Sequence, residues 1–254
     1  MPALPDIGIS TSAYAELFLP TALERIAELA QAAEIRSFGM HTLLSPRNRR
    51  AATSAGLRYT VHGPFGYKGL GDLSETARLE ALGEHRRHVE AGAKIGTRLY
   101  VVHPDWHPER TPRDAAVVAA LERSFVALLE LQEETGVEIV VENMPGAGHS
   151  HFTHPGDLEL LGLGLILDAG HASISGCLED WLADPRAPLR HLHLHDNHGE
   201  GDDDDPHLGL GVGVVDAAAV MAAARAAGAS VVLEHDDEEA VLASLAHLRA
   251  HDLV

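Results

Sequence analysis

The sequence predicts an α/β protein, a (β/α)8 TIM barrel that forms a single domain over residues 1–254. Three observations lead to this prediction. Short apolar runs rich in β-branched residues alternate with longer segments rich in Ala, Leu, Glu and Arg, as expected of buried parallel strands and intervening helices. Eight such runs fit into 254 residues, an ordinary length for this barrel. No linker is long enough to separate two domains, which leaves an open doubly wound sheet as the alternative.

The predicted elements follow one another as strand and helix along the chain. The strands are expected at residues 7–10, 34–38, 58–61, 98–102, 138–141, 164–167, 191–194 and 230–233. The clearest helices are expected at residues 74–94, 114–134, 216–227 and 237–250. Gly136 and Gly228 follow two of these helices and suit their C-termini, while Thr21 and Asp216 suit helix N-termini.

Composition and charge restrict the class of partner. With 45% hydrophobic and 22% charged residues, the chain has the composition of a globular protein with a sizeable core. The formal charge of −19, from 38 acidic against 19 basic residues, opposes binding to phosphate backbones or anionic membranes. Bound divalent cations would offset part of that charge locally, so nucleic acid is disfavoured without being excluded.

Cysteine content and the N-terminus favour a cytoplasmic protein. The single cysteine, Cys177, cannot form an internal disulfide, and "MPALPDIGIS" has neither the basic nor the apolar region of a signal peptide. No window approaches the roughly 18 uninterrupted apolar residues of a membrane span. We therefore expect no membrane partner; the oligomeric state is left open.

Residue types that bind metal ions follow six consecutive predicted strands. In strand order they are His62, His103, Glu142, Asp168, the pair His195 and Asp196, and Glu234. In this barrel such positions converge on the C-terminal rim, where its active sites lie. A single residue of this kind would be interpreted as structural, or as the cap of the next helix. The series instead predicts a metal centre, because partly buried carboxylates are costly unless a cation or proton offsets their charge.

The stretch 191–207, "HLHLHDNHGEGDDDDPH", contains a strand end and a loop end. Alternation places His191, His193 and His195 on one face of the strand, and the strand pattern alone points to His195 as the ligand. In the loop, Asp205 and His207 form a D-x-H pair whose side chains would point the same way in an extended segment. The alternative for Asp205 is that it is simply the last of four solvated aspartates.

An ordered set of motifs runs from His62 to Glu234: "HGPF", "VVHP", "VVENMPGAG", "LDAGH", "HLHD", "DPHLGLGVG" and "VVLE". Together they resemble the xylose isomerase-like superfamily of TIM barrels, which includes endonuclease IV and many sugar and sugar-phosphate isomerases and epimerases. Any one of these motifs is weak, whereas their order along the chain is specific.

The resemblance implies a ligand set. Endonuclease IV-like proteins carry nine ligands for three zinc ions, and this sequence has a matching residue for each. By that resemblance the three ions would be held by His62, His103 and Glu142; by Glu142, Asp168, His193 and Glu234; and by His171, Asp205 and His207. The family pattern H-L-x-D selects His193 rather than His195.

The sugar isomerases and epimerases of the superfamily imply a smaller set, in which Glu142, Asp168, His193 and Glu234 surround one metal. In those enzymes the two glutamates, here Glu142 and Glu234, also act as acid and base on opposite faces of the substrate. This chemistry is consistent with the residue types, because removing a proton next to a carbonyl needs a positioned carboxylate and a metal stabilises the resulting charge.

The ligand set and the composition of the rim loops favour different activities. The full nine-ligand set favours phosphoester hydrolysis. The rim loops, however, lack the series of Lys and Arg residues that would line a DNA groove. The basic "SPRNRR" at 45–50 is as easily a solvated helix face, and no obvious bulky side chain suited to enter a DNA stack follows His62. The favoured function is a metal-dependent isomerase or epimerase acting on a small sugar, polyol or sugar-phosphate-like substrate. The alternatives are an endonuclease IV-like phosphodiesterase or phosphatase and a non-catalytic metal-binding barrel.

The expected cofactor is a divalent metal, one to three ions, with zinc as the first choice and manganese as the alternative. Gly209, Gly211 and Gly213 predict a turn rather than a phosphate-binding loop, because no strand-to-helix context accompanies them. Further histidines near the predicted rim are candidates for contact with the substrate: His107, His149, His151, His154 and His198.

Overall fold

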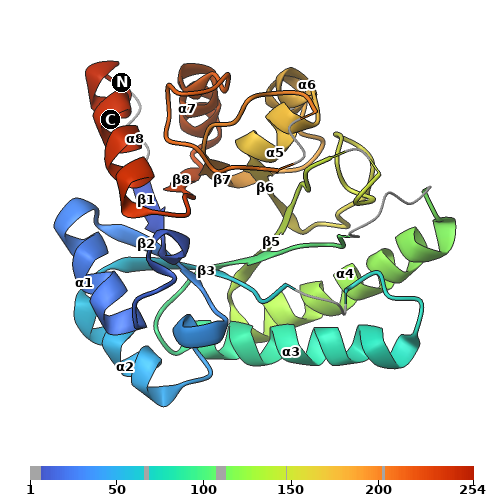
Figure 1. The fold of residues 1–254 in the computed structure, drawn as a ribbon. Coiled ribbons are helices and arrows are strands. Elements are labelled where there is room, and N and C mark those ends of the chain that lie inside the picture. Colours follow the sequence, from blue (N-terminus) through green and yellow to red (C-terminus); the bar gives the residue numbers. More distant parts are fainter. Residues whose placement is uncertain (1–6, 66–68, 107–112, 147, 202–203) are drawn as a thin grey trace.

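The computed structural model describes residues 7–65, 69–106, 113–146, 148–201 and 204–254. Eight parallel strands pair in sequence order and close into a barrel (Figure 1). They are β1 (Ile7–Ser10), β2 (Ala32–Arg36), β3 (Arg58–His62), β4 (Leu99–Val102), β5 (Glu138–Glu142), β6 (Gly164–Asp168), β7 (Leu189–Leu194) and β8 (Ser230–Leu233). The predicted TIM barrel is confirmed, and closure of the sheet rules out the doubly wound alternative.

Helices surround the barrel (Figure 1). They are α1 (Leu19–Leu29), α2 (Pro46–Ala55), α3 (Glu75–Ala93), α4 (Ala115–Thr135), the short α5 (Ala169–Ile174) and α6 (Leu178–Ala183), α7 (Ala217–Ala227) and α8 (Glu238–Ala250). Their inner faces pack with the outward side chains of the strands in one apolar core, to which Phe125 and Leu128 of α4 and Val241 and Leu248 of α8 contribute. Of the described helices, none is long and apolar enough to cross a membrane.

The interior of the barrel changes in polarity along the barrel axis. Leu99, Val101, Val140 and Ile166, from β4, β5 and β6, form a buried apolar cluster separate from the main core. Alternation along a strand sends every second side chain inward, so the next inward residues at the ends of β5 and β6 are Glu142 and Asp168. The interior therefore changes from apolar to ionisable toward the C-terminal rim.

The predicted helix ends are mostly correct. Gly136 and Gly228 end α4 and α7 with φ of 70° and 66°, the left-handed conformation that favours glycine. The Asp216 side chain caps α7 by accepting from the Ala219 amide at 3.0 Å. Thr21 is not a cap, because α1 already begins at Leu19 with a proline in its first turn.

β2 begins two residues before its predicted start at residue 34. Ala32 and Ala33 favour strands only weakly, but pairing with β3 from Ala32–Arg58 to Arg36–His62 incorporates them into the sheet. Glu34 consequently lies in the middle of the strand, where it is fully buried. From this position its carboxylate contacts His191 and His193 of β7.

Candidate metal centre

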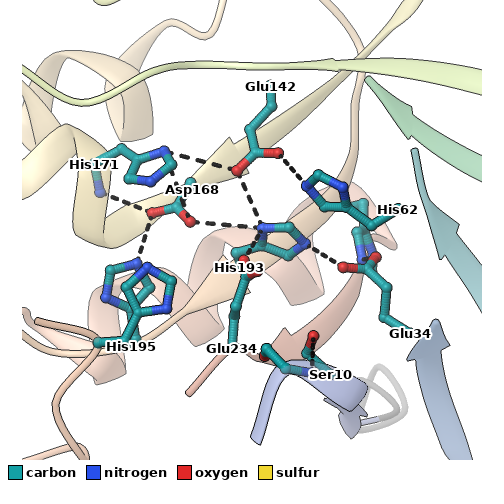
Figure 2. Close-up of polar contacts among 12 residues, drawn as sticks. Ser10, Glu34, His62, Glu142, Asp168, His171, His193, His195 and Glu234 are labelled. Carbon is teal, nitrogen blue, oxygen red and sulfur yellow. Dashed lines mark hydrogen bonds and ion pairs between the residues drawn. The ribbon is translucent and has the colours of Figure 1, made fainter. Parts of the chain in front are cut away.

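The C-terminal rim brings the nine predicted ligands together, as three neighbouring groups whose ligand atoms lie within 4.8 Å of one another inside each group. The first group is His62, His103 and Glu142; the central group is Glu142, Asp168, His193 and Glu234; the third group is His171, His195, Asp205 and His207. Figure 2 shows the central group from several strands pointing toward one another. His195 joins the third group in addition to the residues predicted for it.

The first group converges on one carboxylate oxygen. Glu142 Oε2 lies 3.2 Å from His62 Nε2 and 3.1 Å from His103 Nε2. His62 Nδ1 lies 2.8 Å from the Gly63 carbonyl oxygen. Because a carbonyl oxygen only accepts, Nδ1 keeps its proton, and Nε2 is the nitrogen that faces Glu142 and His103. Two imidazoles and a carboxylate in this arrangement suit a zinc ion.

The central group surrounds one imidazole nitrogen with three carboxylates. His193 Nδ1 lies 3.2 Å from Glu142 Oε1, 3.5 Å from Asp168 Oδ2 and 2.6 Å from Glu234 Oε2. All four side chains are buried. Within the described part of the chain, Asp168 Oδ2 has no hydrogen-bond partner. A buried carboxylate oxygen without a donor is costly, so a cation fits this donor set.

The carboxylates of the central group are held in their ionised form. Burial opposes the charge, but the neighbouring histidines outweigh it: His193 lowers the pKa of Glu234 to about 2. His103 and His193 hold the pKa of Glu142 well below its usual range against the same effect of burial. For Asp168, His171 and His195 do likewise. Charged oxygen ligands are thus present at neutral pH.

Glu34 belongs to this site, although the sequence analysis did not select it. Its carboxylate lies 2.8 Å from His193 Nε2 and 3.1 Å from His191 Nε2, and it accepts a hydrogen bond from Thr60 Oγ1 at 3.0 Å. By accepting from Nε2, Glu34 orients the ring so that His193 Nδ1 faces the three carboxylates, where an ion would take the place of its proton (Figure 2). The sequence did contain an indication of this role, because Glu34 is the acidic residue of the strand "AAEIR". A carboxylate that points into a barrel needs a partner for its charge.

The third group joins the start of α5, the end of β7 and the loop that follows it. Asp205 Oδ2 lies 3.1 Å from His171 Nε2 and 3.2 Å from His207 Nε2. His171 Nδ1 donates to the Asn143 carbonyl oxygen at 2.8 Å, so its Nε2 is the nitrogen that faces Asp205. Asp205 is therefore not a solvated aspartate, which was the alternative interpretation from the sequence.

Asp205 and His207 converge for a different reason than predicted. The expected extended segment is wrong: the two residues, on either side of Pro206, have φ of 43° and 46°. This left-handed conformation is uncommon outside glycine and costs of order 1–3 kcal/mol per residue. The surrounding structure maintains it, since the His207 carbonyl oxygen accepts a hydrogen bond from His235 Nδ1 at 3.0 Å.

The glycine-rich segment after His207 is a turn built around Asp196. The Asp196 carboxylate accepts hydrogen bonds from the backbone amides of Asn197, Gly211, Gly213 and Val215 at 2.8–3.0 Å. These amides are therefore occupied by the protein itself, as the turn prediction requires. Asp196, which follows β7 in the strand-end series, orders the loop and is absent from the ligand groups found in the described residues.

The rim carries a bulky side chain that was not expected there. Phe65, three residues after His62, is 47% exposed and stacks on His103 with ring centroids 5.0 Å apart. The Arg36 guanidinium lies 4.9 Å from the centroid of Phe38 and 5.1 Å from that of Phe65. The expectation of no bulky residue after His62 is corrected: an aromatic and cationic border lies beside the first group.

The other rim histidines that the structure describes lie outside the ligand groups. His151 pairs with Asp105 at 2.6 Å, and His149 stacks on Trp106. His154 lies 3.7 Å from Asp157. His107 falls outside the described residues, and His198 is exposed. Contact of these side chains with a substrate stays a prediction.

The fold and the rim define the class: a TIM barrel with histidines and carboxylates gathered at the C-terminal ends of its strands. The model of the xylose isomerase-like TIM barrel family matches residues 27–251, so the chain belongs to this family. The protein MJ1614 of Methanocaldococcus jannaschii is 32% identical over 181 residues, covering 69% of this chain and 72% of that protein.

Two solved structures illustrate the range of this fold. A D-tagatose 3-epimerase-like protein matches with a TM-score of 0.85 and 24% identity over 97% of this chain and 96% of its own. Endonuclease IV from Thermus thermophilus matches with a TM-score of 0.68 and 22% identity over 97% of this chain and 98% of its own. At these identities the likeness shows the fold, and the same fold carries both kinds of protein.

Proposed function

We propose that this protein is a divalent-metal-dependent isomerase or epimerase that acts on a small sugar, polyol or sugar-phosphate-like substrate. One observation carries the proposal: two ionised carboxylates from different strands flank the same point. Glu142 at the end of β5 and Glu234 after β8 lie 3.2 Å and 2.6 Å from His193 Nδ1. A pair of carboxylates around one centre is what proton transfer to and from carbon requires.

The proposed roles follow from the placement of these residues. Glu142, Asp168, His193 and Glu234 would hold the ion, with zinc as the first choice and manganese as the alternative. Such an ion would polarise the substrate carbonyl and stabilise the charge that develops on its oxygen. Glu34 orients His193, and through it the geometry of the group.

Glu142 and Glu234 would exchange the substrate proton. β5 and β8 are three strands apart in the closed barrel, so their carboxylates approach a bound molecule from different sides. One removes the proton from the carbon next to the carbonyl, and the other returns a proton to the opposite face. Because the pKa of each is lowered, both begin ionised, and the group that acts as the acid must first take up a proton.

A multi-zinc phosphodiesterase or phosphatase of the endonuclease IV type is the alternative. The observation in its favour is that all nine ligands implied by that resemblance lie in three adjoining groups. Clustered metal ions activate water and stabilise a leaving oxygen. The formal charge of −19 argues against a nucleic acid substrate but leaves small phosphoesters open. A non-catalytic metal-binding barrel is the second alternative.

Proton exchange with solvent tests the proposal. The protein is loaded with zinc, manganese or cobalt and incubated with a panel of ketoses, aldoses and their phosphates in deuterium oxide. NMR then detects deuterium at the carbon next to the carbonyl, together with the epimer or isomer. Glu142→Gln and Glu234→Gln should each abolish incorporation.

Glu138→Gln is the matched control. Glu138 begins β5 at the opposite end of the barrel and pairs with Arg190 at 2.8 Å on the surface. This variant should retain activity. Cleavage of DNA at abasic sites, or of small phosphoesters, without deuterium incorporation into any sugar would refute the isomerase proposal and support the alternative.

A further inference from the structure

We infer that His195 is a fourth protein ligand of the third group, so that this group binds a structural ion closed to substrate. The inference rests on the proposed metal centre, but not on the reaction that it catalyses. Structural zinc sites have four protein ligands, whereas catalytic sites keep one position open for water or substrate. The resemblance to endonuclease IV-like proteins implied only His171, Asp205 and His207 here.

Geometry places His195 inside the group. A ligand atom from each of His171, His195, Asp205 and His207 lies within 4.8 Å of the others. The His195 and His207 rings are stacked, with centroids 4.1 Å apart and planes inclined by 21°. His195 Nε2 lies 3.9 Å from Asp205 Oδ1. Three imidazoles and one carboxylate form a donor set that suits tetrahedral zinc.

Three buried atoms of this group have no hydrogen-bond partner within the described residues: His195 Nδ1, Asp205 Oδ1 and His207 Nδ1. Buried polar atoms are almost always satisfied, and three unsatisfied atoms in one group indicate that a partner is missing beside these side chains. Because the set contains an aspartate and imidazole nitrogens that can offer lone pairs, that partner is a cation rather than an anion.

The neighbouring backbone is adapted to the His195 ring. Gly170 lies at the start of α5, directly against the His195 ring. A Cβ atom at this position would collide with the imidazole. A glycine in a helix is unfavourable without a packing reason. Here the reason is space for an imidazole between α5 and the loop.

His195 also has a competing partner. Its Nε2 lies 3.1 Å from Asp168 Oδ1. That oxygen already accepts the His171 amide at 2.7 Å as the cap of α5. His195 is therefore not needed to satisfy Asp168 Oδ1, and a neutral ring that donates Nε2–H to it would still have a free lone pair on Nδ1.

A closed ion would fasten the loop after β7. Its ligands come from α5, from the end of β7, and from Asp205 and His207 on the far side of the loop. An ion bound to all four would hold the intervening segment against the barrel and leave substrate chemistry to the central group.

The test uses His195→Asn in the full-length protein. Zinc content and affinity are measured by competition with a chelator, and crystals are examined by anomalous scattering at the zinc edge. In the wild type, His195 should lie about 2.0–2.1 Å from an ion of the third group. The variant should lose that ion, or bind it roughly 10- to 100-fold more weakly, while the central ion is retained.

Limited proteolysis provides a readout independent of activity. The loop contains Glu200, so a glutamate-specific protease should cleave His195→Asn there faster than the wild type. His198→Asn is the matched control, because it makes the same change at an exposed histidine of the same loop. Gly170→Ala should reproduce the loss of the third ion with all four ligand side chains present, since it displaces the His195 ring.

The outcomes separate the inference from the proposed function. An unchanged third ion in His195→Asn, or an ion with water in the fourth position, overturns the inference. Weakened central binding with an intact third ion would assign His195 to Asp168 instead, and also overturns it. Loss of the third ion in a protein that exchanges no sugar proton supports the inference while the proposed reaction fails.

Discussion

The central and third groups use the same residue types in opposite proportions. The central group has three carboxylates and one histidine, whereas the third has three histidines and one carboxylate. The central group lies at the ends of β5, β6 and β7 and after β8, and the third extends onto the loop after β7. Both groups have four members, so the proposed roles in proton transfer and in holding the loop would differ through the charge of the ligands and not through their number.

The physical basis of this difference is the charge that remains after an ion binds. Three carboxylates offset a divalent ion completely and leave one negative charge in excess, which can accept a proton from a substrate. One carboxylate leaves the ion partly uncompensated, and imidazoles bind it without offering a base. The predictions below test this division, from the largest expected effect to the smallest.

Glu234→Gln should have the largest effect on turnover. It keeps the shape of the side chain but removes a charged base, so we expect a loss of about 10²- to 10⁴-fold in deuterium exchange. Asp205→Asn in the third group should change exchange by much less. Equal losses in the two variants, measured by NMR with the zinc content of each determined, would contradict the division of roles.

Glu34→Gln should weaken the central ion selectively. A glutamine at this position cannot accept from both His193 and His191 as a carboxylate does, so the orientation of His193 is lost. Residues that orient metal ligands typically contribute 10- to 100-fold to affinity. Chelator competition should show this decrease for the central ion, with the third ion unchanged. A uniform decrease at both would instead indicate general destabilisation.

His85 is a buried histidine outside both groups, and its titration should affect stability. Its Nδ1 lies 3.0 Å from the Tyr100 hydroxyl, and burial lowers its pKa from 6.5 to about 3. Below pH 6.5 the His85 side chain binds a proton in the unfolded chain but not in the folded protein. This residue therefore lowers the free energy of unfolding as pH falls. Between pH 7 and 5 the reduction should be about 2 kcal/mol.

His85→Gln removes this titration. Urea unfolding of both proteins without metal should show the variant gaining about 2 kcal/mol relative to the wild type as pH falls from 7 to 5. A pH-independent difference between the two proteins would show that His85 is not held neutral.

Thr60→Val should have the smallest effect. It removes one hydrogen bond to Glu34 and leaves both histidine contacts. A single hydrogen bond contributes about 1 kcal/mol, which corresponds to roughly a five-fold change in affinity for the central ion. A loss as large as that of Glu34→Gln would mean that Thr60, rather than the histidines, positions this carboxylate.

Strand period and the residues that directly follow the strands were sufficient to predict the barrel and the proximity of His62, His103, Glu142, Asp168 and Glu234. Asp168 and Glu142 illustrate this: each ends a strand and converges on the rim for that reason alone. The resemblance was needed to select His193 and the set His171, Asp205 and His207. Whether these residues bind metal stays a prediction. Glu34 was not selected, because a two-residue error in the start of β2 hides its central position.

Other features depend on tertiary structure that no local pattern contains. Asp205 and His207 meet through left-handed backbone on both sides of a proline, which spacing cannot reveal. His195 enters the third group only because Gly170, from the preceding βα unit, leaves space for its ring. Phe65 reaches the rim through a loop whose course the sequence did not indicate.

The polar residues that β2, β7 and β8 contribute to the barrel have a consequence for how this sequence can change over evolution. Glu34 and His191, both buried, and the half-buried Ser230 form a chain of contacts, with His191 Nδ1 lying 2.6 Å from Ser230 Oγ. Replacing Glu34 leaves both His191 and His193 without their acceptor. Replacing Glu34 and His191 together with apolar residues removes both sides of the contact between them but still leaves His193 Nε2 without its partner. Substitutions at these positions are therefore epistatic, because the effect of each depends on which of its partners is already replaced.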